Sequence, residues 1–179
     1  MLKQMNKKYE LTNETKEWYD ITLYRIKALK DFNDVKAGDL GGWIEKEENL
    51  SHNRNCWIYD NAYVYNDARV YGNACVYDDA CVYDNAEVFN NAYVYGDAVV
   101  YDNARIYGNV QVYDNARVYG DANVFDDAHV YGNAKVYGNA YVFDDACVYG
   151  NAHVYGNAKV YGDVFDDAHV YGNAKVYGN

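Results

Sequence analysis

Four histidines are the side chains of this 179-residue sequence best suited to general acid–base chemistry near neutral pH. These are His52, His129, His153 and His169. The last three occupy one outward-facing slot of a six-residue repeat. Spacing places His153 and His169 on adjacent coils, about 5 Å apart, and His129 on a different face. Because exposed repeat slots vary freely, we interpret these histidines as surface positions.

Paired carboxylates are the second group that could do chemistry. The pairs are Asp78-Asp79, Asp126-Asp127, Asp144-Asp145 and Asp166-Asp167. The second and third pairs are 18 residues apart, which stacks them on one corner of adjacent coils. Hard cations need six or more oxygen ligands, so we interpret the pairs as structural corners and expect no metal. The four cysteines form no C-x-x-C pair, so neither zinc nor a disulfide framework is expected.

The elements that must position these residues come from one phrase, Ala-x-Val-Tyr-(Gly/Asp)-(Asn/Asp), which starts near Cys56. Twenty-one such hexads follow, and an aromatic residue comes directly after the aliphatic slot in all 21. Two residues are missing once, between Val160 and Val164. Repeats of this kind form stacked arrays without a central globular core.

Strand alternation decides which side of the array faces inward. Ala and Val share one side, and the x slot shares the other with Tyr. The x slot holds charged residues such as Arg69, Glu87 and Lys135, which cannot line a dry interior unpaired. The sequence therefore predicts buried Ala and Val, outward aromatic ladders and an all-β triangular solenoid. Its 21 hexads give about seven coils over roughly 34 Å. The final Asn or Asp of each hexad is expected to take the left-handed backbone of a corner.

Residues 1–50 do not repeat, and we predict that they form a small β-rich N-terminal cap on a solenoid of residues 51–179. Lys8–Thr12 and Thr22–Leu29 read as strands, with a hairpin turn or a short helix between them. Ile44 and Leu50 read as the first, imperfect rungs. We expect no signal peptide and no membrane span, and a location in the cytoplasm of a bacterial host.

The repeat resembles the hexapeptide-repeat, left-handed parallel β-helix superfamily, whose aliphatic residue is followed four later by a small one, as in Val70 and Ala74. The N-terminal stretch with Gly41-Gly42-Trp43 and Cys56-Trp57-Ile58 resembles YdcK-like proteins of enterobacteria. Similar tyrosine-rich repeats occur in phages and prophages. The superfamily resemblance implies trimeric acyltransferases with a histidine base and acetyl-CoA or acyl carrier protein as donor. No long loop interrupts the coils to build a pocket, so we predict that the protein is not an enzyme and needs no cofactor.

The acidic charge favours a binding function. Residues 51–179 hold 7 Lys/Arg and 17 Asp/Glu, which disfavours nucleic acid and anionic membranes as partners and suits a basic protein surface. We predict a rigid, phage- or prophage-encoded binding protein that could occupy the basic groove of a host nucleic-acid enzyme such as a CRISPR nuclease. An acyltransferase-like enzyme and a structural phage component are the alternatives. The candidate partner-binding residues are Tyr63, Tyr93, Tyr141, Asp126, Asp127, Asp144 and Asp145.

The last hexad suggests self-association. The sequence stops in mid-repeat, which predicts an open strand edge that pairs with a second copy. The residues expected at such an end-to-end homodimer contact are Lys175, Val176 and Tyr177.

Overall fold

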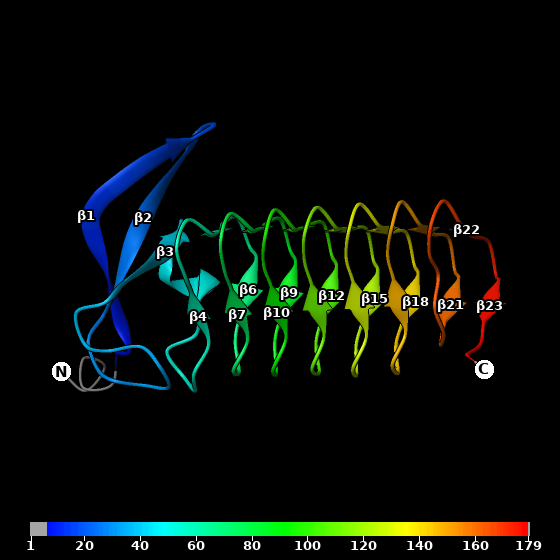
Figure 1. The fold of residues 1–179 in the computed structure, drawn as a ribbon. Coiled ribbons are helices and arrows are strands. Elements are labelled where there is room, and N and C mark those ends of the chain that lie inside the picture. The colour runs from blue at the N-terminus through cyan, green and yellow to red at the C-terminus, as the bar shows by residue number, and fades with distance from the viewer. Residues whose placement is uncertain (1–6, 179) are drawn as a thin grey trace.

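The computed structural model describes residues 7–178, which form a parallel β-solenoid preceded by a β-hairpin (Figure 1). Residues 1–6, which bear on the expected lack of a signal peptide, and Asn179 lie outside the described residues. The described chain contains no α-helix, and its one short 3-10 turn is η1 (Glu47–Asn49). No helix within it is long and apolar enough to cross a membrane. The prediction of an all-β solenoid of about seven coils is confirmed.

Three sheets form the faces of the solenoid. The ten-stranded sheet contains β1 (Tyr9–Trp18), β2 (Ile21–Ala28), β3 (Leu40–Ile44), β5 (Tyr63–Val64), β8 (Cys81–Val82), β11 (Val99–Val100), β14 (Arg117–Val118), β17 (Lys135–Val136), β20 (His153–Val154) and β22 (His169–Val170). The six-stranded sheet contains β4 (Trp57–Ile58), β7 (Cys75–Val76), β10 (Tyr93–Val94), β13 (Gln111–Val112), β16 (His129–Val130) and β19 (Cys147–Val148). The seven-stranded sheet contains β6 (Arg69–Val70), β9 (Glu87–Val88), β12 (Arg105–Ile106), β15 (Asn123–Val124), β18 (Tyr141–Val142), β21 (Lys159–Val160) and β23 (Lys175–Val176).

Each solenoid strand pairs in parallel with the strand one coil further on. Val94 pairs with Val112, 18 residues later, and this register repeats along the stack. The inward Ala and Val side chains are fully buried from Ala74 to Val160, and the aromatic rings project outward as three stacked ladders. Tyr95 and Tyr113, for example, stack at 4.9 Å with 2° between the rings. The predicted orientation of both sets of side chains is therefore confirmed.

Corner geometry differs from the expectation in one respect. The left-handed residue is the fifth of each hexad, as at Asp84 (φ 57°) and Gly132 (φ 69°), and not the final Asn or Asp. The final residue instead bonds to its counterpart on the next coil, as Asn85 Nδ2 donates to Asn103 Oδ1 at 3.2 Å. Glycine is required where coils approach closely, since a Cβ on Gly108 would lie 2.6 Å from the carbonyl oxygen of the next coil.

The two-residue deletion is absorbed locally. After it the register is 16 residues, as in the pairing of Lys159 with Lys175. Val164 keeps an isolated parallel bridge to Val148. The carboxylate of Asp163 accepts the N–H of Cys147 at 3.1 Å, where alanine carbonyls accept the matching N–H elsewhere in the stack. One side chain thus replaces a missing rung hydrogen bond.

The N-terminal segment joins the solenoid through the ten-stranded sheet. β1 and β2 form an antiparallel hairpin that leans away from the coils in Figure 1, as predicted, and β3 pairs in parallel with β5. Ile44 pairs with Val64 and Leu50 bridges to Val70, which confirms both as first rungs. Ile26 and Tyr9 pack into the same core as the coils. The left-handed sense of the coil, the role of the hairpin as a cap and the division at residue 50 stay predictions.

Candidate interaction surface

Five of the predicted partner-binding residues lie together on one edge of the solenoid. Tyr141 begins a hexad of the seven-stranded sheet, and Asp144-Asp145 end the same hexad. Asp126-Asp127 end the equivalent hexad one coil earlier, and the N–H of Asp127 bonds to the carbonyl of Asp144 at 3.1 Å. This confirms the predicted stacking of the two acidic pairs.

Two phenylalanines complete this edge. Phe125 and Phe143 stack at 4.9 Å with 2° between the rings, and Tyr141 packs edge-on against Phe125 at 6.5 Å. The acidic pairs did not single out these rings in the sequence, although the same 18-residue spacing relates them. We call this set the acidic aromatic patch: Phe125, Asp126, Asp127, Tyr141, Phe143, Asp144 and Asp145.

The patch is exposed, and its charge is left largely uncompensated. Tyr141 is 38% exposed, and all four carboxylates are exposed. Asp127 accepts a hydrogen bond from Asn109 at 2.8 Å, but no ion pair among the described residues involves any of the four. The ammonium of Lys159 lies 5.6 Å from the ring centroid of Tyr141, so this ring already contacts one cation.

Tyr93 lies on a different sheet, in a separate shallow pocket of about 380 Å³ formed with Tyr77, Asp78, Tyr95 and Gln111. It is 39% exposed and stacks at 6.1 Å on Tyr77, while Tyr95 stacks on the ring of the following coil. The aromatic ladder is therefore interrupted at this pocket. The structure separates Tyr93 from the acidic aromatic patch.

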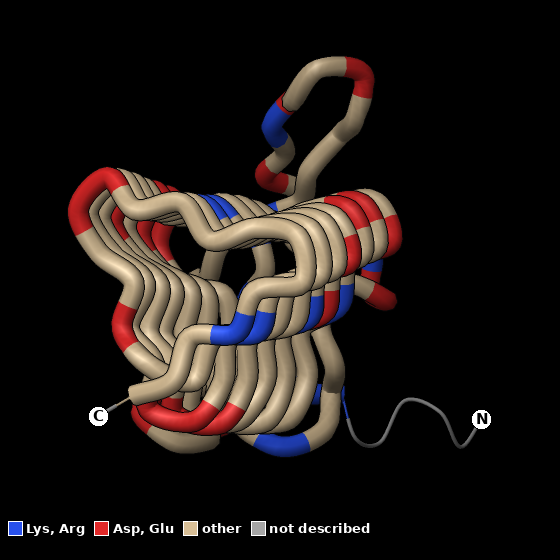
Figure 2. Tube along the Cα trace, turned by 90° about the vertical axis from the view of Figure 1, so that its right-hand side faces the viewer, with Lys and Arg blue, Asp and Glu red and all other residues tan. Residues whose placement is uncertain are grey.

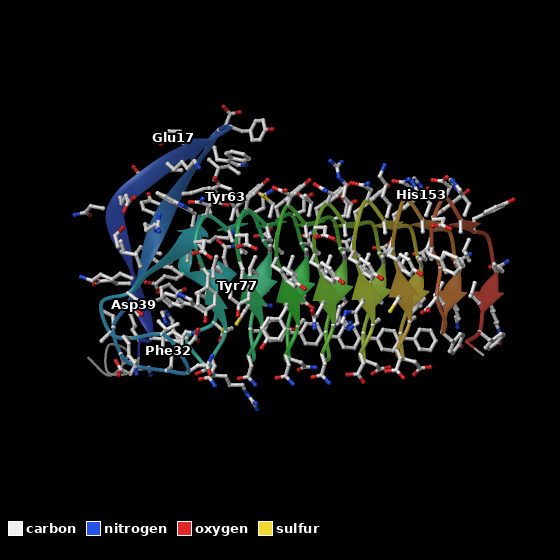
Figure 3. All side chains as sticks on the ribbon, in the orientation of Figure 1. Glu17, Phe32, Asp39, Tyr63, Tyr77 and His153 are labelled. Atoms are coloured by element: carbon white, nitrogen blue, oxygen red, sulfur yellow. The ribbon has the colours of Figure 1, made fainter. Side chains whose placement is uncertain are left out.

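Tyr63 is not available to a partner, which corrects its place among the candidates. Only 7% of the residue is exposed. Its ring stacks on Trp18 of the hairpin at 4.9 Å, and its hydroxyl accepts a hydrogen bond from Lys16 (Figure 3). The outward slot that would display this tyrosine is covered because the N-terminal hairpin folds over it.

Charge is segregated by position on the coil. Figure 2 shows acidic residues gathered at the corners and basic residues on the stretches between them. The ten-stranded sheet presents Arg117 and Lys135 in register on its outer side. One corner forms a polar groove with Asp84, Asp102 and Asp121 among its lining residues.

The histidines lie where the spacing predicts. His153 and His169 pair on adjacent coils with ring centroids 4.8 Å apart, and His129 is on the six-stranded sheet (Figure 3). Burial, with Lys135 and His169 nearby, lowers the pKa of His153, which favours its neutral form. His52 is half-buried beside the hairpin, stacked on Tyr9 at 4.3 Å.

Metal and disulfide chemistry find no assembled site in the described part of the chain. No group of three or more His, Cys, Asp or Glu residues there is arranged to hold a metal ion. All four cysteines are free, and four strand spacings separate Cys75 from Cys147. Lys175, Val176 and Tyr177 lie in β23, which pairs with β21, and Tyr177 is 65% exposed. End-to-end self-association through them stays a prediction.

Stacked hexads, outward aromatic ladders and parallel two-residue strands define a hexapeptide-repeat β-solenoid protein. Residues 68–84, 100–114 and 110–125 match the family model described as the YdcK β-solenoid repeat. The chain is also 42% identical over 62 residues to a protein of Escherichia coli (strain K12) named "Uncharacterized acetyltransferase YdcK". This alignment covers 30% of the chain and 19% of that relative. The chain is thus a YdcK-like β-solenoid protein, as its sequence indicated.

This likeness overturns one expectation. The uninterrupted coils led to the prediction that the protein is not an enzyme, but the relative that it resembles carries the name of an acetyltransferase. The absence of a long loop within the repeat is a property of this segment alone, since the match spans about a fifth of the relative. Lack of catalysis therefore does not follow from regular coils.

Proposed function

We propose that the solenoid is a rigid scaffold that presents the acidic aromatic patch to a basic segment of a protein partner. The observation that carries this proposal is the exposed ring of Tyr141 beside four carboxylates that no described cation neutralises. Exposed aromatic surface of this kind is typical of interaction sites. Rigid stacking fixes the positions of these groups before binding, which reduces the entropy lost on association.

Arginine is the side chain that fits the patch best. Its guanidinium can stack on the face of Tyr141 or Phe143 while donating two hydrogen bonds to a carboxylate. Carboxylate pairs repeated at the coil spacing would hold successive basic residues of an extended segment. Lysine would gain the charge attraction but not the planar stacking.

In its finer form, the proposed partner is a basic protein that normally binds nucleic acid. Residues 51–179 carry 17 acidic side chains over about seven coils, a charge density of the order found along one DNA strand. A phage- or prophage-encoded protein with this surface could compete for the groove of a host enzyme such as a CRISPR nuclease. Loss of binding in the presence of excess duplex DNA would distinguish this partner class from other basic proteins.

The proposal is tested by titrating a fluorescent oligoarginine peptide and following fluorescence anisotropy. Replacing Asp126, Asp127, Asp144 and Asp145 together by Asn should weaken binding about tenfold or more, since exposed ion pairs contribute roughly 0.2–1 kcal/mol each. Asn keeps the left-handed corner backbone, so the fold should be retained.

The matched control changes Asp78, Asp79, Asp166 and Asp167 to Asn, which removes the same charge from a different corner. It should bind nearly as well as the unaltered protein. Tyr141→Ala should also weaken binding, whereas Tyr93→Ala on the other sheet should not. Equal losses in both quadruple variants, or no saturable binding at all, would rule the patch out.

Acetyl transfer is a second candidate function, favoured by the name of the relative and by His153. A neutral imidazole can accept a proton from an acceptor hydroxyl or amine, and the lowered pKa of His153 maintains that form. Lys135 pairs with His153 in register, and Arg117 with Lys135, so positive charge lies beside the base. Such charge would attract the phosphates of acetyl-CoA.

Release of the CoA thiol from acetyl-CoA, with glucosamine and serine as probe acceptors, measures this activity. His153→Asn should slow thiol release about 100-fold, the usual effect of losing a general base. His129→Asn, on the six-stranded sheet, should leave the rate unchanged. A rate at the buffer background, or the same loss in both variants, would argue against His153.

A further inference from the structure

A lysine is fully buried where the hairpin meets the first coil. Lys8 is 0% exposed, which is rare for lysine, and its ammonium lies 5.1 Å from the ring centroid of Phe32. Its Nζ donates to the carbonyl oxygen of Cys56 and lies 3.2 Å from Sγ of the same residue. No ion pair among the described residues includes Lys8. The burial therefore has no carboxylate to offset it.

Burial drives this pair toward its uncharged forms. Desolvation lowers the pKa of Lys8 and raises the pKa of Cys56, which is also 0% exposed. A neutral amine has a free electron pair, and here it lies within van der Waals contact of a sulfur atom. Cys75 provides an internal comparison, because it is a buried thiol whose described hydrogen-bond partner is a backbone carbonyl.

We propose that Lys8 and Cys56 form an oxidation-dependent N–O–S bridge that ties the hairpin to the first coil. One hydrogen peroxide converts the thiol to a sulfenic acid and releases one water. A second peroxide oxidises the pair further: the S–O–H and N–H bonds lose their hydrogens, an O–N bond forms, and two waters leave. The sum is one amine, one thiol and two peroxides giving one Nζ–O–Sγ bridge and three waters.

The geometry selects the oxygen-bridged product over a direct S–N bond. Nζ and Sγ are 3.2 Å apart, a gap that one bridging oxygen nearly fits. A direct bond would require the two atoms to approach by about 1.5 Å in a close-packed interior. The bridge would close a loop from residue 8 to residue 56, which restricts the unfolded chain and stabilises the junction.

Intact mass of the full chain tests the proposal after reduction and then treatment with hydrogen peroxide. The bridge adds about 14 Da, one oxygen gained and two hydrogens lost, and dithiothreitol should remove it. Peptide mapping should find Lys8 linked to the peptide that contains Cys56. The Cys75→Ser variant should still gain this mass, and Cys56→Ser should not.

Three results would overturn the bridge while the protein remains folded by circular dichroism. They are an unmodified Cys56, oxidation of Cys56 by oxygen addition without linkage, and a loss of about 2 Da from a direct S–N bond. Cys56→Ser is the variant of choice because Ser preserves a small polar side chain beside Lys8. A supporting result is a higher melting temperature of the oxidised protein, by about 5 °C, that Cys56→Ser does not show.

Discussion

Replacing Val100 by aspartate is expected to unfold the middle of the solenoid, whereas the same change at Val99 is expected to leave the fold intact. Val100 is 0% exposed and pairs with Val82 and Val118 inside the stack. A carboxylate there has no partner, and burying it costs more than about 4 kcal/mol even if it takes up a proton. Because each coil contacts only its neighbours, the stack would lose continuity at this point.

The neighbouring valine is the matched control. Val99 faces outward, half-buried, and pairs with Arg117 on the next coil, so a carboxylate there gains a cationic neighbour. Its effect on the free energy of unfolding should stay within about 0.5 kcal/mol. Urea unfolding followed by far-UV circular dichroism measures both variants. A Val100→Asp variant with an unchanged midpoint would contradict the assignment of the inner face.

Alternation made the solenoid readable from sequence because its rule is local. Adjacent residues of a strand face opposite sides, so charged x-slot residues such as Lys135 fix the direction of Ala and Val without any tertiary knowledge. The 18-residue register follows from three hexads per coil, which placed His153 above His169 correctly. Each of these inferences needed only the repeat and one steric or solvation argument.

Contacts with the hairpin were beyond that reasoning. Tyr63 looked like any outward ring, and only the path of β1 over the first coils buries it. The Lys8–Cys56 contact joins residues 48 apart in sequence, across an interface that no repeat rule describes. The same limit applies at the corners, where the left-handed position depends on how one coil rests on the next.

The acidic aromatic patch shows an intermediate case. Spacing alone stacked the two Asp-Asp pairs, and exposure of Tyr141 followed from its slot. Their union into one surface required knowing that the corner directly follows the same sheet. Tyr93 occupies an equivalent slot but faces away from that corner, on the six-stranded sheet. Slot identity therefore predicts exposure, whereas face identity decides which residues act together.

Strong alkali is expected to unfold the protein because the tyrosine ladders resist ionisation. Burial, with the neighbouring ladder tyrosines, raises the pKa of Tyr83 to about 12 and that of Tyr113 to about 12. Burial also raises the pKa of many other ladder tyrosines, including Tyr101 and Tyr137. In the unfolded chain these groups titrate near about pH 10. The folded state therefore holds more protons than the unfolded state above that pH.

The sign of the effect follows from proton linkage. This tyrosine contribution to stability is fully present below about pH 10 and is lost as pH rises through the folded pKa values near about 12. Each group contributes a slope of at most about 1.4 kcal/mol per pH unit. Lys8 acts in the opposite direction, since its lowered pKa makes stability rise as pH approaches about 10.4. One lysine cannot offset a ladder of tyrosines, so the net change above pH 10 is destabilising.

Urea unfolding between about pH 9 and about pH 12, with tyrosinate absorbance recorded in parallel, measures this loss. The absorbance should rise together with the loss of β structure, because ionisation and unfolding are linked. A Tyr83→Phe, Tyr113→Phe variant retains the stacked rings without their ionisable hydroxyls, so its stability should fall less steeply with pH. Corner carboxylates repel one another at every pH in this range, and they are unchanged in the variant. An identical pH slope in both proteins would assign alkaline unfolding to other groups and refute the role of these hydroxyls.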